Sequence, residues 1–171
     1  MALVAAEILL LDQISKYYVL HVLQLDMVRA IDVLPPWLNL RMAWNEGINF
    51  GLFASSGTVM KWLLIAIALV VCAGVILWMH RLRPGRLAQV SAGLLIGGAL
   101  GNVIDRLIYG AVADFLNMSL PFWQNPYSFN VADIAIFAGA IGLILFPPEP
   151  KPKPGAKTVR AKPRDGSGKS R

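Results

Sequence analysis

The stretch that decides the fold is Val59–Met79, VMKWLLIAIALVVCAGVILWM, which has a single charged side chain. A helix of this length covers roughly 30 Å, the thickness of the hydrocarbon core of a bilayer. Trp62 and Trp78 stand near its two ends, where tryptophan prefers the membrane–water interface. The whole chain has 56% apolar and 15% charged residues, whereas a soluble domain has about a quarter charged residues. The sequence therefore predicts a protein whose solvent is the membrane.

Three further segments are read as membrane spans, although the last is short for a bilayer. They are Ala2–Val22, Leu87–Tyr109 and Val131–Phe146. The first has no basic start and is interrupted by Asp12, Gln13 and Lys16, unlike a secretory signal peptide, so we interpret it as a retained helix. The expected fold class is an all-α polytopic membrane protein with four transmembrane helices.

Basic residues give the expected orientation and the division of the chain. The loop His80–Arg86 holds three arginines, and residues 147–171 hold eight basic and two acidic residues. Both lie on one side of a four-span protein, so we expect both chain ends in the cytoplasm. Residues 1–146 are formally neutral, which argues against a nucleic-acid-binding face. We predict a membrane domain of residues 1–146 and a disordered cytoplasmic tail of residues 147–171 that attracts anionic lipids.

The first outer loop contains a predicted strand. Apolar Leu38, Leu40, Met42 and Trp44 alternate with other residues, a period of two that suits a strand with one buried face. We expect a small β-sheet and loop cradle on the outer face of the membrane.

Small residues recur at four-residue spacing in two of the spans. Gly93, Gly97 and Gly101 lie in Leu87–Tyr109, and the last span has Ala135 with Gly139 and Ala138 with Gly142. Such spacing lets helix backbones approach closely in lipid. We therefore assign these glycines to packing and give them no part in the chemistry.

Several ionisable residues lie at membrane depth, where each costs about 2.5–3.5 kcal/mol on insertion scales. Asp12 and Lys16 are one helical turn apart and close enough to pair. Asn102, Asp105 and Arg106 share one helix face. Both groups have a purely structural interpretation, in which Asp12 with Lys16 tethers a helix and the other three satisfy one another.

Asp114 and Asp133 come from different segments and are expected at the same depth. Asp114 follows the outer end of its span, after Gly110, and Asp133 lies near the outer start of the next, together with Asn130. The topology thus predicts two carboxylates converging just under the outer surface. Paired carboxylates can share a proton and perform acid–base catalysis. For Asp114 alone, a solvated loop carboxylate is an equally open interpretation.

Other catalytic chemistries lack the residues that they need. His21 and His80 are expected on opposite sides of the membrane, and Cys72 has no partner for an internal disulfide. The sequence contains neither a His-Glu-x-x-His pattern nor a cluster of cysteines. We predict no metal and no other cofactor.

Five sequence blocks resemble the lipoprotein signal peptidases, also called signal peptidase II. They are DQISK at Asp12–Lys16, NEGINFG at Asn45–Gly51, GALGNVIDR at Gly98–Arg106, GAVADF at Gly110–Phe115, and FNVAD at Phe129–Asp133. Each block is weak alone, but all of them in order, within four spans, form a specific pattern. The chain departs from the family at Ile48 and Asn49, where smaller residues are usual, and this departure affects the expected pocket beside the cleaved bond.

The resemblance implies an intramembrane aspartyl endopeptidase of the bacterial inner membrane, and we expect it to be a monomer. Its implied substrates are diacylglyceryl-modified prolipoproteins, cut before the lipidated cysteine near the periplasmic side. Asp114 and Asp133 would be the catalytic pair. The residues that would support the site or bind substrate are Asp12, Lys16, Asn45, Gly47, Asn102, Asp105, Arg106 and Asn130. The loop around Phe50, Leu52 and Phe53 would cover the cleft and accept lipid.

Two other function classes remain open at this point. One is a proton-coupled transporter in which Asp105, Asp114 and Asp133 form a relay. Four spans without an inverted repeat argue against it. The other is a non-enzymatic assembly protein whose polar residues join helices.

Overall fold

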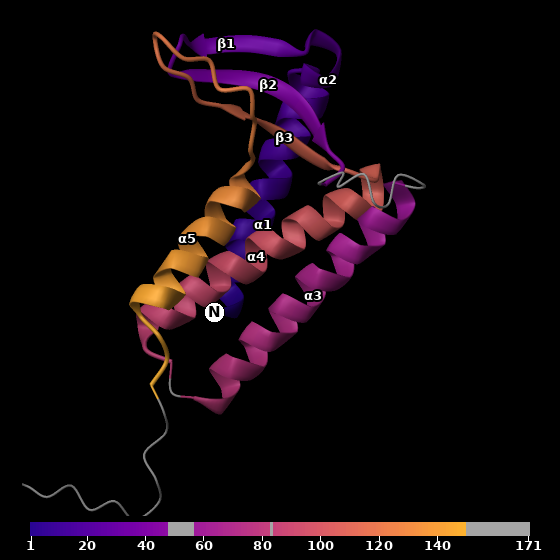
Figure 1. Ribbon diagram of the computed structural model, residues 1–171. Coiled ribbons are helices and arrows are strands. Elements are labelled where there is room, and N and C mark those ends of the chain that lie inside the picture. Colours follow the sequence, from indigo (N-terminus) through magenta and orange to yellow (C-terminus); the bar gives the residue numbers. More distant parts are fainter. Residues whose placement is uncertain (48–56, 83, 150–171) are drawn as a thin grey trace, which may run out of the picture.

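The computed structural model describes residues 1–47, 57–82 and 84–149. Its helices are α1 (Ala2–Tyr17), the π-helical η1 (Tyr18–Val22), α2 (Leu25–Val28), α3 (Gly57–Arg81), α4 (Arg86–Tyr109) and α5 (Val131–Leu145). Its strands are β1 (Ala30–Leu34), β2 (Leu38–Asn45) and β3 (Val112–Asn117). The long helices form a bundle, and the sheet lies across one end of it (Figure 1).

The four predicted spans correspond to α1 continued by η1, to α3, to α4 and to α5, with nearly the predicted bounds. Among the described helices, α3 and α4 are long and apolar enough to cross a membrane. α5 has 15 residues, a length of roughly 22 Å, which is less than a bilayer core. A membrane fold is therefore supported by α3 and α4, and the number of four spans remains a prediction.

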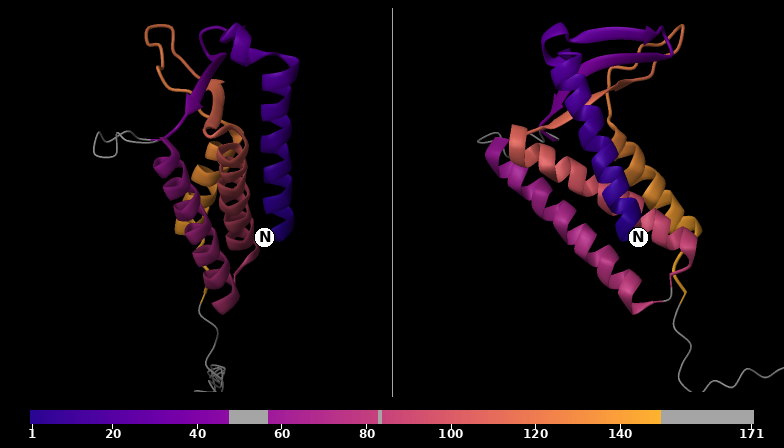
Figure 2. Two further views of the ribbon diagram at one scale, coloured as in Figure 1. Left: turned by 90° about the vertical axis from the view of Figure 1, so that its right-hand side faces the viewer. Right: turned by 180° about the vertical axis from the view of Figure 1, so that it is seen from behind.

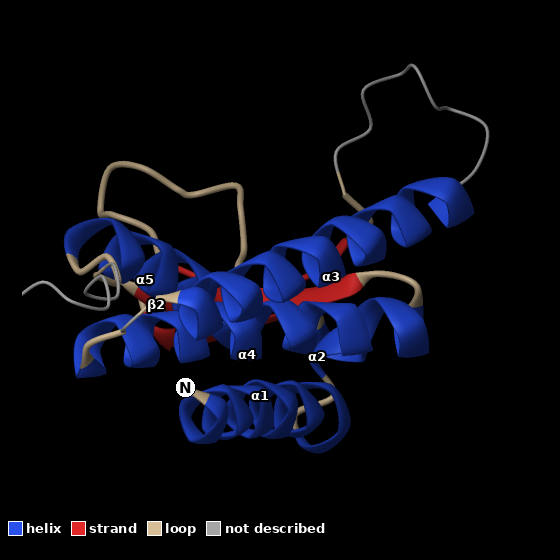
Figure 3. Cartoon of the chain, turned by 90° about the horizontal axis from the view of Figure 1, so that it is seen from below, coloured by secondary structure: helices blue, strands red, loops and turns tan. Residues whose placement is uncertain are grey.

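α4 is the central helix of the bundle and contacts α1, α3 and α5. The view from below shows α4 between α1 and α3 (Figure 3). Its neighbours α1 and α5 also contact each other. The outward surfaces of α3 and α5 carry exposed apolar side chains, among them Val70, Phe137 and Ile144. These surfaces suit a hydrocarbon solvent.

The predicted role of the small residues in packing is confirmed. A Cβ atom at Gly97 would lie 2.5 Å from the carbonyl oxygen of Ala5 in α1, and one at Gly139 would lie 2.6 Å from the backbone of Ser91 in α4. Both distances are too short for a real side chain. The helix backbones therefore come as close as they do because glycine stands at these positions.

The sheet is antiparallel with strand order β1-β2-β3. β2 occupies the predicted residues, Leu38–Asn45. Its Leu40 packs with Val19, Leu25 and Phe115, which joins the sheet to η1 and α2. The two further views in Figure 2 show the sheet at the same end of the bundle as the start of α5.

β3 was not predicted. Gly110 ends α4 in a left-handed conformation with φ +84°, as expected, but the chain then enters a strand that pairs with β2, Ala43 opposite Asp114. The interpretation of Asp114 as a solvated loop residue is therefore wrong, since its side chain is buried in the sheet. Five of the six β3 residues are buried, so the strand lacks the alternation that reveals a half-exposed one.

We expect Gly139→Ala to destabilise the bundle, because the added Cβ meets the backbone of Ser91 and Leu95 in α4. Overpacking of this kind costs about 1–3 kcal/mol. The control is Gly74→Ala, since nothing lies within 4 Å of a Cβ there and alanine raises helix propensity. Thermal unfolding in detergent should give a lower Tm for Gly139→Ala alone. Equal Tm values for the two variants would contradict the packing argument.

Candidate active site

Asn130 connects the two candidate catalytic carboxylates. Its side-chain Nδ2 donates to Asp114 Oδ1 at 2.6 Å, and its Oδ1 accepts the backbone N–H of Asp133 at 2.9 Å. Its own backbone N–H donates to Asp133 Oδ2 at 3.3 Å. Asn130 is thus the N-cap of α5 and Asp133 completes a capping box. Asp114 from β3 and Asp133 from α5 therefore meet at one fully buried amide.

Asn102 and Asn45 provide the other two side-chain amides that hydrogen-bond to this carboxylate pair. Asn102 of α4 donates from Nδ2 to Asp133 Oδ1 at 2.9 Å, and its Oδ1 accepts from Asn130 Nδ2 at 3.3 Å. Asn45, the last residue of β2, donates from Nδ2 to Asp114 Oδ2 at 2.9 Å. Each carboxylate thus accepts hydrogen bonds from neutral amides.

Gly47 fixes the position of Asn45. The N–H of Gly47 donates to Asn45 Oδ1 at 3.0 Å, which turns the Nδ2 group of Asn45 toward Asp114. Gly47 has φ +102°, a conformation that favours glycine. The residues that follow, including Ile48, Asn49 and the predicted loop around Phe50, Leu52 and Phe53, lie outside the described residues.

Behind the pair lies an ionic cluster centred on Lys16. Lys16 Nζ lies 2.8 Å from Asp12 Oδ2 and 2.7 Å from Asp105 Oδ2, and it donates to Asn102 Oδ1 at 3.2 Å. All four side chains are buried. The predicted pairing of Asp12 with Lys16 is confirmed.

The two carboxylates of this cluster each hold a backbone amide next to a member of the pair. Asp105 Oδ2 accepts the N–H of Ala113 at 3.1 Å, and Asp12 Oδ1 accepts the N–H of Ala132 at 2.9 Å. Ala113 immediately precedes Asp114, and Ala132 immediately precedes Asp133. One lysine therefore links the supports of both backbone segments.

The interpretation that Asn102, Asp105 and Arg106 satisfy one another needs correction. Asp105 pairs with Lys16, and within the described ranges no ion pair joins it to Arg106. Arg106 Nη1 donates to the carbonyl oxygen of Asn102 at 3.2 Å, while its buried Nε has no hydrogen-bond partner in the described part of the chain. Asp105, and after it Asp114 and Asp133, are the negative charges that interact with the Arg106 guanidinium.

Gln13 is a member of the ionic cluster that the site prediction missed. Its Nε2 donates to Asp105 Oδ1 at 3.0 Å and to Asp12 Oδ2 at 3.2 Å. It also reaches the carbonyl oxygen of Gly101 at 3.3 Å. The position of Gln13 beside Asp12 in the DQISK block was the sequence signal that could have indicated its membership of the cluster. Only the three-dimensional fold shows that its amide bridges α1 and α4.

The pKa of Asp114 is raised from 3.8 to about 6, and burial is the largest cause. The hydrogen bonds from Asn45 and Asn130 work against this rise by stabilising the ionised form, whereas the charge of Asp133 contributes to it. A carboxyl group with this pKa can hold or release a proton near neutral pH. The arrangement is chemically suited to general acid–base catalysis by two adjacent carboxylates.

Comparisons with known proteins point to one family. Residues 4–147 match the family model for signal peptidase (SPase) II. The chain is 43% identical over 145 residues to a lipoprotein signal peptidase of Methylorubrum extorquens (strain PA1), covering 85% of this chain and 83% of the relative. It is 38% identical to that of Pseudomonas aeruginosa, covering 81% of each.

A solved structure has a similar fold. It is described as a bacterial membrane enzyme, and it superposes with a TM-score of 0.69 at 27% sequence identity over 84% of this chain and 88% of that one. The resemblance read from the motifs is thereby confirmed.

We expect Lys16→Met to destabilise the protein strongly, because Asp12 and Asp105 would stay buried without their cation. Removing one partner of a buried ion pair costs about 3–5 kcal/mol. The matched control is Arg41→Met, which breaks the exposed pair with Asp32, an interaction of about 0–1 kcal/mol. Thermal unfolding in detergent at neutral pH measures both. A Tm for Lys16→Met equal to that of Arg41→Met would refute the structural role of the cluster.

Proposed function

The chain belongs to the signal peptidase II family, and from this premise we propose that it is an aspartic-type endopeptidase of the membrane. Its substrates are precursors of lipoproteins that carry a diacylglyceryl group on a cysteine. It cuts before that cysteine and so removes the signal peptide. Asp114 and Asp133 are the catalytic pair. The observation that carries this proposal is that both carboxylates, although they come from different elements, are held by Asn130.

The pair works with one shared proton. Two adjacent carboxylates do not both ionise easily, so they titrate as a unit. Asp114, buried and with its pKa raised to about 6, holds the proton. Asp133, less buried and capped by Asn130, acts as the base.

Peptide hydrolysis then follows in two steps. Asp133 takes a proton from water, and the water oxygen forms a bond to the carbonyl carbon of the substrate. Asp114 donates its proton to the developing oxyanion. In the second step the C–N bond breaks, the amine leaves with the proton held by Asp133, and one hydroxyl of the tetrahedral intermediate returns a proton to Asp114 as the carboxylic acid forms. Proton count is conserved, and no group outside the pair and the water is needed.

The residues around the pair position it and contact the substrate. Asn45 and Asn102 orient the two carboxylates. Arg106, whose buried Nε has no partner in the described ranges, supplies positive charge toward the oxyanion or donates to the substrate backbone. Asp12, Lys16, Gln13 and Asp105 keep the backbones at Ala113 and Ala132 in place.

The proposed setting is the bacterial inner membrane with four spans and both chain ends in the cytoplasm. The sheet and the pair then lie at the periplasmic end, where water reaches the peptide bond while acyl chains remain in lipid. Residues 1–146 form the peptidase and 147–171 a basic tail near anionic lipid. We further propose that the enzyme acts as a monomer, since α1, α4, α5 with its N-cap, and the sheet of one chain supply every group named above.

The transporter alternative receives no support from the comparisons. Asp105, one of the three residues of the suggested relay, is held by Lys16 at 2.7 Å and by Gln13 at 3.0 Å. A carboxylate with such partners is a structural anchor.

We expect Asp114→Asn and Asp133→Asn to fold and to abolish cleavage, because asparagine keeps the shape of the side chain but cannot exchange the shared proton. Activity should fall at least about 1,000-fold, as when general acid–base groups are removed. The assay uses purified protein in detergent and a synthetic lipidated precursor. Asp26→Asn, a change to a carboxylate of α2, is the control and should stay active. Turnover above one-tenth of wild type by either pair variant would remove the proposed mechanism.

The pH profile of kcat/KM should fall on the alkaline side as the pair loses its last proton, with a midpoint near the pKa of about 6. Asn45 stabilises ionised Asp114 through its hydrogen bond. Asn45→Ala should therefore move this alkaline limb to higher pH, whatever its effect on the maximum rate. A limb that stays in place or moves to lower pH would show that Asn45 does not tune the pair.

A further inference from the structure

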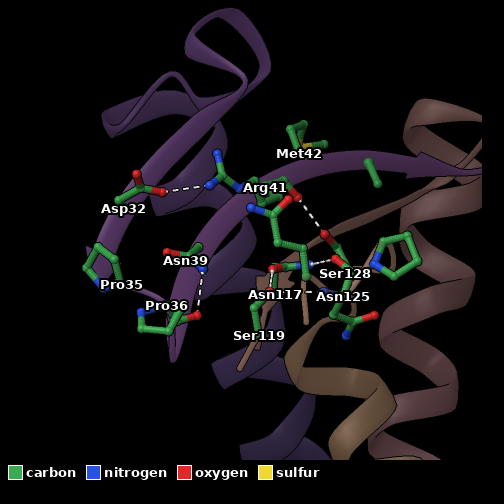
Figure 4. A pocket seen from close by; sticks show the side chains of 13 residues that line it. Asp32, Pro35, Pro36, Asn39, Arg41, Met42, Asn117, Ser119, Asn125 and Ser128 are labelled. Atoms are coloured by element: carbon green, nitrogen blue, oxygen red, sulfur yellow. Dashed lines mark hydrogen bonds and ion pairs between the residues drawn. The ribbon is translucent and has the colours of Figure 1, made fainter. Parts of the chain in front are cut away.

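A cavity of about 460 Å³ with a mixed polar and apolar lining lies on the sheet. One wall comes from β1 and β2, with Asp32, Asn39 and Arg41, and the other from the segment that follows β3, with Gln124 and Asn125. Figure 4 shows side chains from the two walls facing each other across it. Its size falls in the range of ligand-binding clefts, about 300–1,000 Å³. None of these residues belongs to the candidate active site.

The lining is rich in neutral hydrogen-bonding groups. Asp32 and Arg41 pair at 2.8 Å and so offset each other in charge. Asn39 donates from Nδ2 to the carbonyl oxygen of Pro36 at 3.0 Å, but its buried Oδ1 has no partner among the described residues. The other polar lining residues are Asn117, Ser119, Gln124, Asn125 and Ser128. Asn117, Ser119 and Ser128 already donate hydrogen bonds within the chain, so the groups offered to a bound molecule are the Oδ1 of Asn39 and the amide of Gln124 at the exposed rim. Amides of this kind match the N–H and C=O groups of a polypeptide backbone.

The cavity and the catalytic pair are built on the same two strands. Ala43 of β2 lines the cavity and lies opposite Asp114 of β3 in the register. Two residues further along β2, Asn45 hydrogen-bonds to Asp114. That separation is roughly 7 Å along a strand. A chain bound at the pair therefore reaches the cavity within a few residues.

We propose that this cavity binds the segment of the precursor that follows the lipidated cysteine, in extended form and through its backbone. This proposal rests on the proposed function. The signal peptide and the acyl chains are apolar and stay in lipid, so only the chain after the cysteine enters water at the sheet. Recognition by neutral amides favours backbone over side chains, which lets one site accept precursors of many sequences.

The test compares two lipidated substrates that share one signal peptide. The long substrate continues for about six residues after the cysteine, a reach of roughly 20 Å, and the short one ends at the residue after the cysteine. Gln124→Trp fills the cavity from its exposed rim. Met118→Trp is the matched control, since it adds similar bulk at an exposed position of the same segment outside the cavity.

Gln124→Trp should raise KM about tenfold for the long substrate, the effect of losing one or two hydrogen bonds. Its kcat and its KM for the short substrate should stay at wild-type values, and Met118→Trp should change neither. Equal KM values of wild type for the two substrates, or an equal effect of Gln124→Trp on both, would overturn the cavity proposal while cleavage itself continued. Failure of the proposed function appears differently, as cleavage that survives Asp114→Asn with both substrates.

Discussion

The site depends on one buried ammonium group. Lys16 lies between Asp12 and Asp105 inside the bundle. Each of those carboxylates also accepts a backbone N–H, that of Ala132 at Asp12 and that of Ala113 at Asp105. Burying three charges costs several kcal/mol per ion unless each has close partners. Because the partners belong to α1, α4, α5 and β3, the cluster forms only when all four elements are in place. The two aspartates that follow the held amides are thereby positioned by electrostatics rather than by loop length.

Close helix packing makes this cluster geometrically possible. A Cβ on Gly101 of α4 would lie 2.5 Å from Asp12 Oδ2. A larger residue there would push Asp12, and with it α1, away from Asp105 of α4 and Ala132 of α5. The small residues assigned to packing thus also determine how closely the charged groups of the ionic cluster can approach one another. Helix packing and ion pairing depend on the same residues in this part of the molecule.

The helices and β2 could be predicted because their signals are local. Apolar runs gave the helix bounds nearly to the residue, and the alternation of Leu38, Leu40, Met42 and Trp44 gave the strand. β3 has no such signal, since it is buried on both faces around Asp114. The partner of Asp105 was also beyond prediction, because Arg106 is adjacent in sequence whereas Lys16 is brought near only by tertiary packing. The convergence of Asp114 and Asp133 was predictable from topology, but the role of Asn130 in joining them was not.

The spatial arrangement of charged and neutral groups explains how Asp114 and Asp133 can keep a shared proton. A cation directly against a carboxylate lowers its pKa by about 1–3 units and would hold it ionised. Here the amides of Asn45, Asn102 and Asn130 surround the pair, and Lys16 lies one layer behind, already paired with Asp12 and Asp105. The influence of Lys16 on Asp114 is accordingly smaller than those of burial, the amides and Asp133, and the pKa stays raised, at about 6. An amide, unlike a cation, can hold a carboxyl group in position without fixing its protonation state. The fold thus separates the charge that orders the site from the proton that the proposed reaction moves.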